Sequence, residues 1–223
     1  YTEGGSIMAA GTVRVASYQN EASGSSKFGA VAELGAAAVG ISGAQITSNT
    51  ATATANAKNY AYVKGTSFGT EAARSGNLEI LSRVDSYAKA GFTNSAATLT
   101  GYNAGVMVMT ATAKGDFKAE LDSSDANIYV TDLSVQNQYL ATAEAKSTQP
   151  GGGISAGLVS GTTNKATAVT STNATGGITG SGSVDARNIA ILVSGDGSKA
   201  IADVDGAKVT ITAGFVGINL ADA

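Results

Sequence analysis

Residues 110–122, with the sequence TATAKGDFKAELD, alternate strictly between small or apolar and polar side chains. Because successive side chains of a β-strand point to opposite faces, a period of two predicts a strand with one dry face. The polar face is predicted to carry Thr110, Thr112, Lys114, Asp116, Lys118 and Glu120. The dry face is predicted to carry Ala111, Ala113, Gly115, Phe117, Ala119 and Leu121.

The same alternation returns in residues 52–64 and 165–178. In the first of these, Ala53, Ala55, Ala57, Ala61 and Val63 are predicted to point inward. Recurrence at a roughly fixed spacing is typical of a repeat array, whose units bury their apolar faces by stacking on their neighbours. In such a stack, Lys58 is predicted to lie near Asp116, Ala61 near Ala119, and Val63 near Leu121.

A second series of strand-like segments gives another measure of the repeat length. Aligning Val13, Leu78, Leu133 and Val184 gives intervals of 65, 55 and 51 residues. Aligning Ala53, Ala111 and Ala166 gives 58 and 55 residues. The disagreement in the first interval predicts a surface insertion of about seven residues within residues 64–77, because loops tolerate such insertions.

Composition favours a long, thin molecule. The chain of 223 residues has no Trp and only 8 Tyr and 5 Phe, so its interior must be filled mainly by Ala, Val, Ile and Gly. Closely opposed strands with small side chains can reach native packing density, whereas an ordinary globule needs bulkier residues. The Ala-rich residues 36–39 are predicted to be non-helical, because Gly35, Gly40 and Gly43 flank them and Gly disfavours helices. Residues 150–153 are predicted to form a corner.

Charge and residue usage exclude several functions. The net charge is −3 and there is no basic cluster, which argues against binding nucleic acid. No apolar stretch approaches the roughly 20 residues of a membrane-spanning helix. The absence of Cys and His removes thiolate ligands and the Ser/His and Cys/His catalytic pairs. We therefore expect no enzyme, no catalytic or cofactor-binding residues, no metal ligands and no cofactor.

Several polar groups nevertheless have a functional interpretation. Two sets of carboxylates could gather in a groove, as in carbohydrate-active β-helix enzymes, although a role in turns is favoured. These sets are Asp122, Asp125 and Asp132, and Asp196, Asp203 and Asp205. The row Thr50, Thr52 and Thr54 could order water on an ice-binding face, although Thr also simply suits an exposed strand. The better candidates for contact with a partner are Tyr18, Tyr60, Tyr62, Tyr102 and Tyr129.

These observations predict an all-β fold, a β-solenoid (a wide-coil parallel β-helix) of about four degenerate repeats. The approximate repeats are residues 11–75, 76–130, 131–181 and 182–223 of a single array. Uncapped ends of such an array expose unpaired strands, so we expect self-association end to end or with flanking repeats.

The motifs GNLEILSRVDSYAKA (residues 76–90), TATAKGDFKAELD (110–122) and ANIYVTDLSV (126–135) carry a family resemblance. Their arrangement resembles the repeats of large leukotoxin-like filamentous adhesins of Gram-negative anaerobes, surface proteins of the two-partner-secretion or autotransporter kind. The likeness extends over residues 11–219. It implies a β-solenoid stalk on the bacterial surface that acts in adhesion, aggregation or host contact, and it identifies no binding residues. Neither a secretion domain nor a signal peptide is evident.

Overall fold

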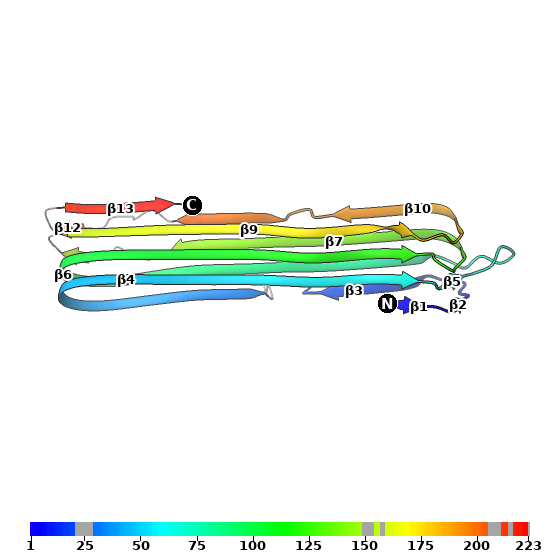
Figure 1. The fold of residues 1–223 in the computed structure, drawn as a ribbon, viewed down its shortest axis with the longest axis horizontal. Coiled ribbons are helices and arrows are strands. Elements are labelled where there is room, and N and C mark those ends of the chain that lie inside the picture. Colours follow the sequence, from blue (N-terminus) through cyan, green and yellow to red (C-terminus); the bar gives the residue numbers. More distant parts are fainter. Residues whose placement is uncertain (21–28, 149–153, 157–158, 205–210, 214–215, 223) are drawn as a thin grey trace.

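A computed structural model describes residues 1–20, 29–148, 154–156, 159–204, 211–213 and 216–222. Over these residues the protein is all-β, with no helix (Figure 1). The strands are β1 (Thr2–Glu3), β2 (Ser6–Ile7), β3 (Val13–Gln19), β4 (Ala30–Lys64), β5 (Ser67–Phe68), β6 (Leu78–Asp122), β7 (Ile128–Thr148), β8 (Ile154–Ala156), β9 (Val159–Thr179), β10 (Val184–Ser194), β11 (Lys199–Val204), β12 (Ile211–Ala213) and β13 (Val216–Asp222).

All pairings between these strands are parallel, and β6 lies at the centre of the sheet. On one side β6 pairs with β3 and β4, and on the other it pairs with β7, β8 and β9. The strands β10 and β11 in turn pair with β7. Because each strand pairs with a segment of the next repeat rather than with its own neighbour in sequence, the repeats lie side by side in register.

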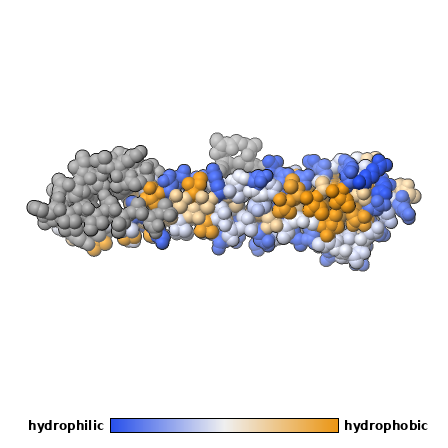
Figure 2. Space-filling view, turned by 90° about the horizontal axis from the view of Figure 1, so that it is seen from above, coloured by the Kyte–Doolittle hydropathy of each residue, from blue (hydrophilic) through white to orange (hydrophobic). Residues whose placement is uncertain are grey.

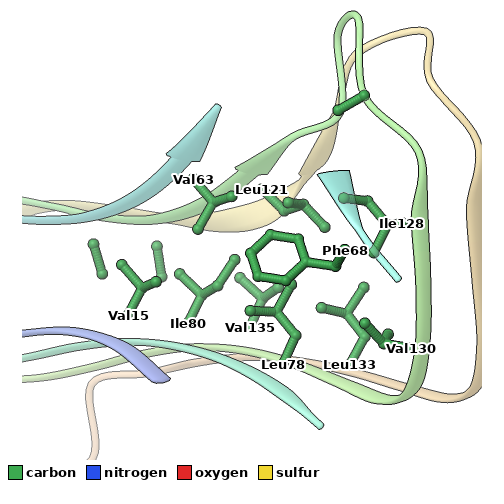
Figure 3. Packing of buried hydrophobic residues seen from close by; sticks show 13 residues of the cluster. Val15, Val63, Phe68, Leu78, Ile80, Leu121, Ile128, Val130, Leu133 and Val135 are labelled. Atoms are coloured by element: carbon green, nitrogen blue, oxygen red, sulfur yellow. The ribbon is translucent and has the colours of Figure 1, made fainter. Parts of the chain in front are cut away.

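The long strands curl back on themselves, so the sheet is elongated and strongly curved (Figure 1). As a result, the beginning and the end of β6 face each other across one core. Leu78 and Ile80 from its beginning belong to the same buried cluster as Ala119 and Leu121 from its end. Figure 3 shows Val63 and Leu121 on one side of the Phe68 ring, and Leu78 and Ile80 on the other.

A second cluster, along the middle of the strands, is built mostly from alanine. It includes Ala88 and Ala90 from the outgoing half of β6 and Ala111 and Ala113 from its returning half, all completely buried. Small side chains allow the two halves to approach closely and fill the space between them. The expected interior of small residues is therefore confirmed.

The predicted facing of the alternating segments is confirmed. Ala111, Ala113, Phe117, Ala119 and Leu121 are completely or almost completely buried, and the polar residues between them are exposed or partly exposed. Lys58 pairs with Asp116, Ala61 with Ala119 and Val63 with Leu121, as the spacing predicts. Residues 36–39 lie within β4 and are not helical.

The predicted alignment is wrong at two positions, Val184 in the fourth predicted repeat and Ala166 in the third. Val184 pairs with Ile128, and the partner of Leu133 is Ile189. Likewise Ala166 pairs with Met109, while the partner of Ala111 is Ala168. The error at Ala166 is a shift of two residues, which preserves the side chains that point inward, so alternation alone cannot exclude it. The error at Val184 is a shift of five residues, because Val184 continues the inward position of Ile128, nearer the start of β7 than Leu133.

The predicted insertion is also in the wrong place. Strand β3 pairs with residues 65 positions further on, whereas β4 pairs with residues 58 positions further on. The additional seven residues therefore lie between Gln19 and Ala30, mostly in residues 21–28, which are outside the described part of the chain. Residues 64–77 are not simply a surface loop, because the Phe68 side chain is completely buried. The predicted corner at residues 150–153 lies outside the described residues.

Candidate functional surfaces

The strand β10 leaves an apolar row half exposed. Ile189 and Ile191 pair with Leu133 and Val135 of β7, so they continue two columns of inward-facing side chains that run across the sheet. Leu133 and Val135 are 1% and 0% exposed. In contrast, the exposed fractions of Ile189 and Ile191 are 51% and 50%. Figure 2, which looks onto this side of the molecule, shows a hydrophobic patch. Within the described residues β10 pairs only with β7, so its other edge has no described partner strand.

The opposite side of the sheet has an edge of its own, formed by β3 and β4. Strand β3 pairs with β6 alone among the described strands, and β4 pairs along its length with β6 and only at Val63 and Lys64 with β1. Tyr18, Val31 and Leu34 are exposed apolar side chains on these two strands. Both ends of the parallel array therefore present strands with unsatisfied backbone groups, which can pair with further strands.

A third surface lies on the outer face of the sheet, near the ends of β4 and β6. It carries Tyr60 and Tyr62, whose hydroxyls reach two different carboxylates of β6. The Tyr60 hydroxyl donates to Asp116 Oδ2 at 2.5 Å, and the Tyr62 hydroxyl donates to Asp122 Oδ2 at 3.1 Å. Lys118 lies between Asp116 and Asp122 along β6 and is the cross-strand partner of Tyr60. Its Nζ lies 5.5 Å from the centre of the Tyr62 ring.

The pKa values of Tyr60, Tyr62 and Asp122 are shifted from their ordinary values, each with a different main cause. The bond to Asp116 is the main cause that raises the Tyr60 pKa, whereas burial is the main cause that raises the Tyr62 pKa. Hydrogen bonds from Ser124 are the main cause that lowers the Asp122 pKa. Both tyrosines therefore stay protonated at neutral pH and act as hydrogen-bond donors to carboxylates.

An open cleft of about 830 Å³ adjoins these tyrosines. It is lined by Tyr1, Tyr60, Tyr62, Asp116, Lys118, Asn173 and Thr175. The polar groups within it already contact one another. Asn173 Nδ2 donates to Asp116 Oδ1 at 3.2 Å, and Lys118 forms an ion pair with Glu120.

The tyrosines predicted as contact candidates do not form one site. Tyr60 and Tyr62 come together in the cleft, whereas Tyr18 is 48% exposed on β3, at another surface. Tyr129 is partly buried at the start of β7, and the side chain of Tyr102 is outside the described part of the structure. Sequence reasoning missed Lys118 and Asn173, which join the site only once the cross-strand register is known.

In the first predicted set of carboxylates, Asp122 and Asp132 accept hydrogen bonds from nearby groups. Asp122 accepts a hydrogen bond from the backbone N–H of Ser124, and Asp132 accepts one from Asn188 Nδ2 at 2.7 Å. Asp125 is an exposed turn residue with a φ of 59°. These contacts agree with the interpretation of these residues as turn and cross-strand groups.

The second set is arranged similarly. Asp196 accepts a hydrogen bond from the Ser194 hydroxyl at 2.8 Å in the turn between β10 and β11. Asp203 is exposed on β11, and Asp205 lies outside the described residues. Within the described residues, no group of three or more acidic, His or Cys side chains is placed to hold a metal ion.

The predicted threonine row is exposed but does not extend evenly over the neighbouring strands. Thr52 pairs with Thr110, which pairs with Thr167. The column of Thr50 continues as Val108 and Lys165, and the column of Thr54 continues as Thr112 and Val169. The three-strand hydroxyl surface is therefore one column wide, which argues against an ordered water lattice.

Comparisons with protein-family models, curated proteins and solved structures find no match to this chain. Among the described residues, no helix has the length and apolar character needed to cross a membrane.

Proposed function

We propose that the chain is a β-solenoid segment of an extracellular bacterial surface or filament protein, with a structural and adhesive role rather than a catalytic one. In this proposal each repeat forms one wide coil, and the coils stack along one axis. The support is the constant register: apart from β3, the described long strands pair with segments 55–58 residues away. The absence of Cys is compatible with export.

The observation that carries the proposed role in assembly is the half-exposed row of β10. Ile189 and Ile191 stand in columns whose other members are buried, so a further coil or the β3 edge of another copy would complete the pattern. In a register that continues these columns, Val13 of the next copy would lie against Ile189, and Val15 against Ile191. Such a contact joins the β10 edge of one copy to the β3 edge of the next. Because the two edges differ, it produces a filament and not a closed dimer.

The experiment is analytical ultracentrifugation of the chain over a wide concentration range. We expect the wild-type chain to associate progressively, and the double variant Ile189→Glu/Ile191→Glu to remain monomeric, because each carboxylate would have to be buried without a partner. The matched control is Ala190→Glu, on the same strand but on the outer face, which should associate like the wild type. A wild-type chain that stays monomeric at high concentration would contradict the proposal.

A further inference from the structure

The cleft beside Tyr60 and Tyr62 has the features of a binding site for a small polar molecule. Its volume of about 830 Å³ lies within the range of roughly 300–1,000 Å³ that is common for such sites. Its lining comes from β4, β6 and β9, which are adjacent strands of one sheet, and from Tyr1 before β1, and its aromatic residues are not buried in the core. Tyr60 is 46% exposed, so its ring is available to a ligand.

The tyrosine rings are held in place before any ligand arrives. The Tyr60 hydroxyl is bonded to Asp116 and the Tyr62 hydroxyl to Asp122, so the two rings are anchored at different points along β6. Anchoring reduces the conformational entropy that ordering of these side chains would otherwise cost upon binding. The segment of β6 that anchors them is paired on both sides, with β4 and with β9.

Charge on the cleft wall is balanced, which argues against an ionic ligand. Lys118 is paired with Glu120, and Asp116 accepts hydrogen bonds from Tyr60 and Asn173. A quaternary ammonium group would require aromatic rings without a neighbouring cation, but Lys118 Nζ lies 5.5 Å from the Tyr62 ring centre. An anionic ligand would meet the carboxylate of Asp116.

Hydrogen-bonding capacity remains in the cleft beyond the bonds that its side chains already make with one another. The carboxylate of Asp116 and the amide oxygen of Asn173 have further lone pairs, and the Thr175 hydroxyl can both donate and accept. A molecule that fits must offer an apolar face to the rings and several hydroxyl groups to these side chains. A pyranose ring combines these properties, because its axial C–H groups form a flat apolar face and its hydroxyls lie around the edge.

We propose that this cleft binds a neutral oligosaccharide, with Tyr60 stacking on a sugar ring and Asp116, Asn173 and Thr175 bonding its hydroxyls. The proposed function does not require this site, which lies on the outer face of the strands and not at their open edges. The two proposals are therefore tested independently.

The experiment measures binding of the full chain to a defined panel of probes. The neutral probes are lactose, N-acetyllactosamine, cellotetraose and maltotetraose, and the charged probes are sialyllactose and phosphocholine. Because the chain has no Trp, tyrosine fluorescence is directly observable, and comparison with Tyr60→Ala separates the signal of the cleft from that of the other tyrosines. We expect saturable binding of at least one neutral probe and none of the charged probes.

Variants connect binding to the cleft. Tyr60→Ala should weaken binding of the neutral probe by at least about tenfold, whereas Tyr60→Phe, which keeps the ring, should weaken it less. The matched control is Tyr18→Ala, which removes a tyrosine of nearly equal exposure, 48% against 46%, from another surface. Circular dichroism confirms that each variant is folded, and Thr175→Ala provides a second variant in the cleft with a small side-chain change.

Three results would overturn the inference. These are the absence of saturable binding to every neutral probe, equal binding by the wild type and Tyr60→Ala, and preferential binding of phosphocholine or sialyllactose. The double variant Ile189→Glu/Ile191→Glu should bind the sugar normally while failing to associate. Tyr60→Ala should show the reverse behaviour.

Discussion

Phe117 is, together with Phe68, one of the two largest completely buried side chains, and small neighbouring residues leave space for its ring. It is completely buried, and its ring centre lies 5.5 Å from that of Tyr139. The remaining contacts in its cluster are Ala57, Val84 and Ala174. The ring also occupies the space where a side chain at Gly115 would stand. Gly115 is therefore required for packing and not for its backbone conformation.

Substitution of Gly115 tests this relationship. In Gly115→Ala the new methyl group would overlap the Phe117 ring, which would have to move within a closely packed core. We expect the free energy of unfolding to fall by about 1–3 kcal/mol, the usual cost of overpacking. The matched control is Gly177→Ala, where the added methyl group meets nothing within 4 Å. Chemical denaturation measures both, and equal effects at the two positions would contradict the assigned packing.

Among the described side chains of the buried core, none carries a charge. Ala113 is completely buried and pairs with Ala55 and Thr170 on the two neighbouring strands. Ala113→Lys would place a cation in this dry interior without a partner. We expect loss of the native fold, or a decrease in the free energy of unfolding of more than about 3 kcal/mol.

Circular dichroism and thermal unfolding check this expectation, and Ala119→Asp should behave in the same way. Thr54→Lys is the control, because this exposed position on the outer face of β4 accepts a solvated charge. If Ala113→Lys unfolds at the same temperature as the wild-type chain, the assigned facing is wrong.

Alternation in the sequence predicted which side chains of a strand point inward. It could not distinguish registers that differ by two residues. The spacing of 58 residues predicted the pairing of Lys58 with Asp116, and the opposite charges agreed with it. The third predicted repeat has no such marker, and the alignment of Ala166 with Ala111 is two residues away from the observed pairing. Strand period alone cannot correct such an error, since the inward set stays inward.

Buried asparagines could not be predicted from alternation either. Asn59 and Asn137 occupy inward positions and connect the two halves of the curled sheet. Asn59 Nδ2 donates to the backbone oxygens of Ser17 and Arg83, and Asn137 Nδ2 to those of Phe117 and Thr175. In the sequence, a polar residue at an inward position interrupts the alternation. Only the structure shows the partner across the core that allows it to be buried.

The candidate surfaces were predictable to a similar extent. Tyr60 and Tyr62 were recognised because large amphipathic side chains on a polar face are contact candidates. Asn173 joins them only through its pairing with Asp116, two strands away from Tyr60. Ile189 was missed because the alignment of Val184 with Leu133 assigned Val184, and not Ile189, to this apolar column.

Across the whole molecule, stability is expected to decline from the centre of the array to its edges. Strand β6 has paired neighbours on both sides along most of its length, whereas β10 has one described neighbour. In a parallel sheet, alternate residues of a strand direct their N–H groups to opposite sides. Half of the β10 amides therefore face the open edge, while those of β6 bond on both sides.

Hydrogen–deuterium exchange at residue resolution tests this distribution and the proposed assembly together. At low concentration, we expect slow exchange throughout β6 and an alternation of slow and fast exchange along β10, because unpaired amides lack protection. At high concentration the fast amides of β10 should become protected as another copy pairs with its edge, while β6 stays unchanged. The Ile189→Glu/Ile191→Glu variant should keep the alternating pattern at every concentration. Uniformly slow exchange along β10 at low concentration would show that its outer edge is already paired within one chain, and the edge would then not be available for assembly.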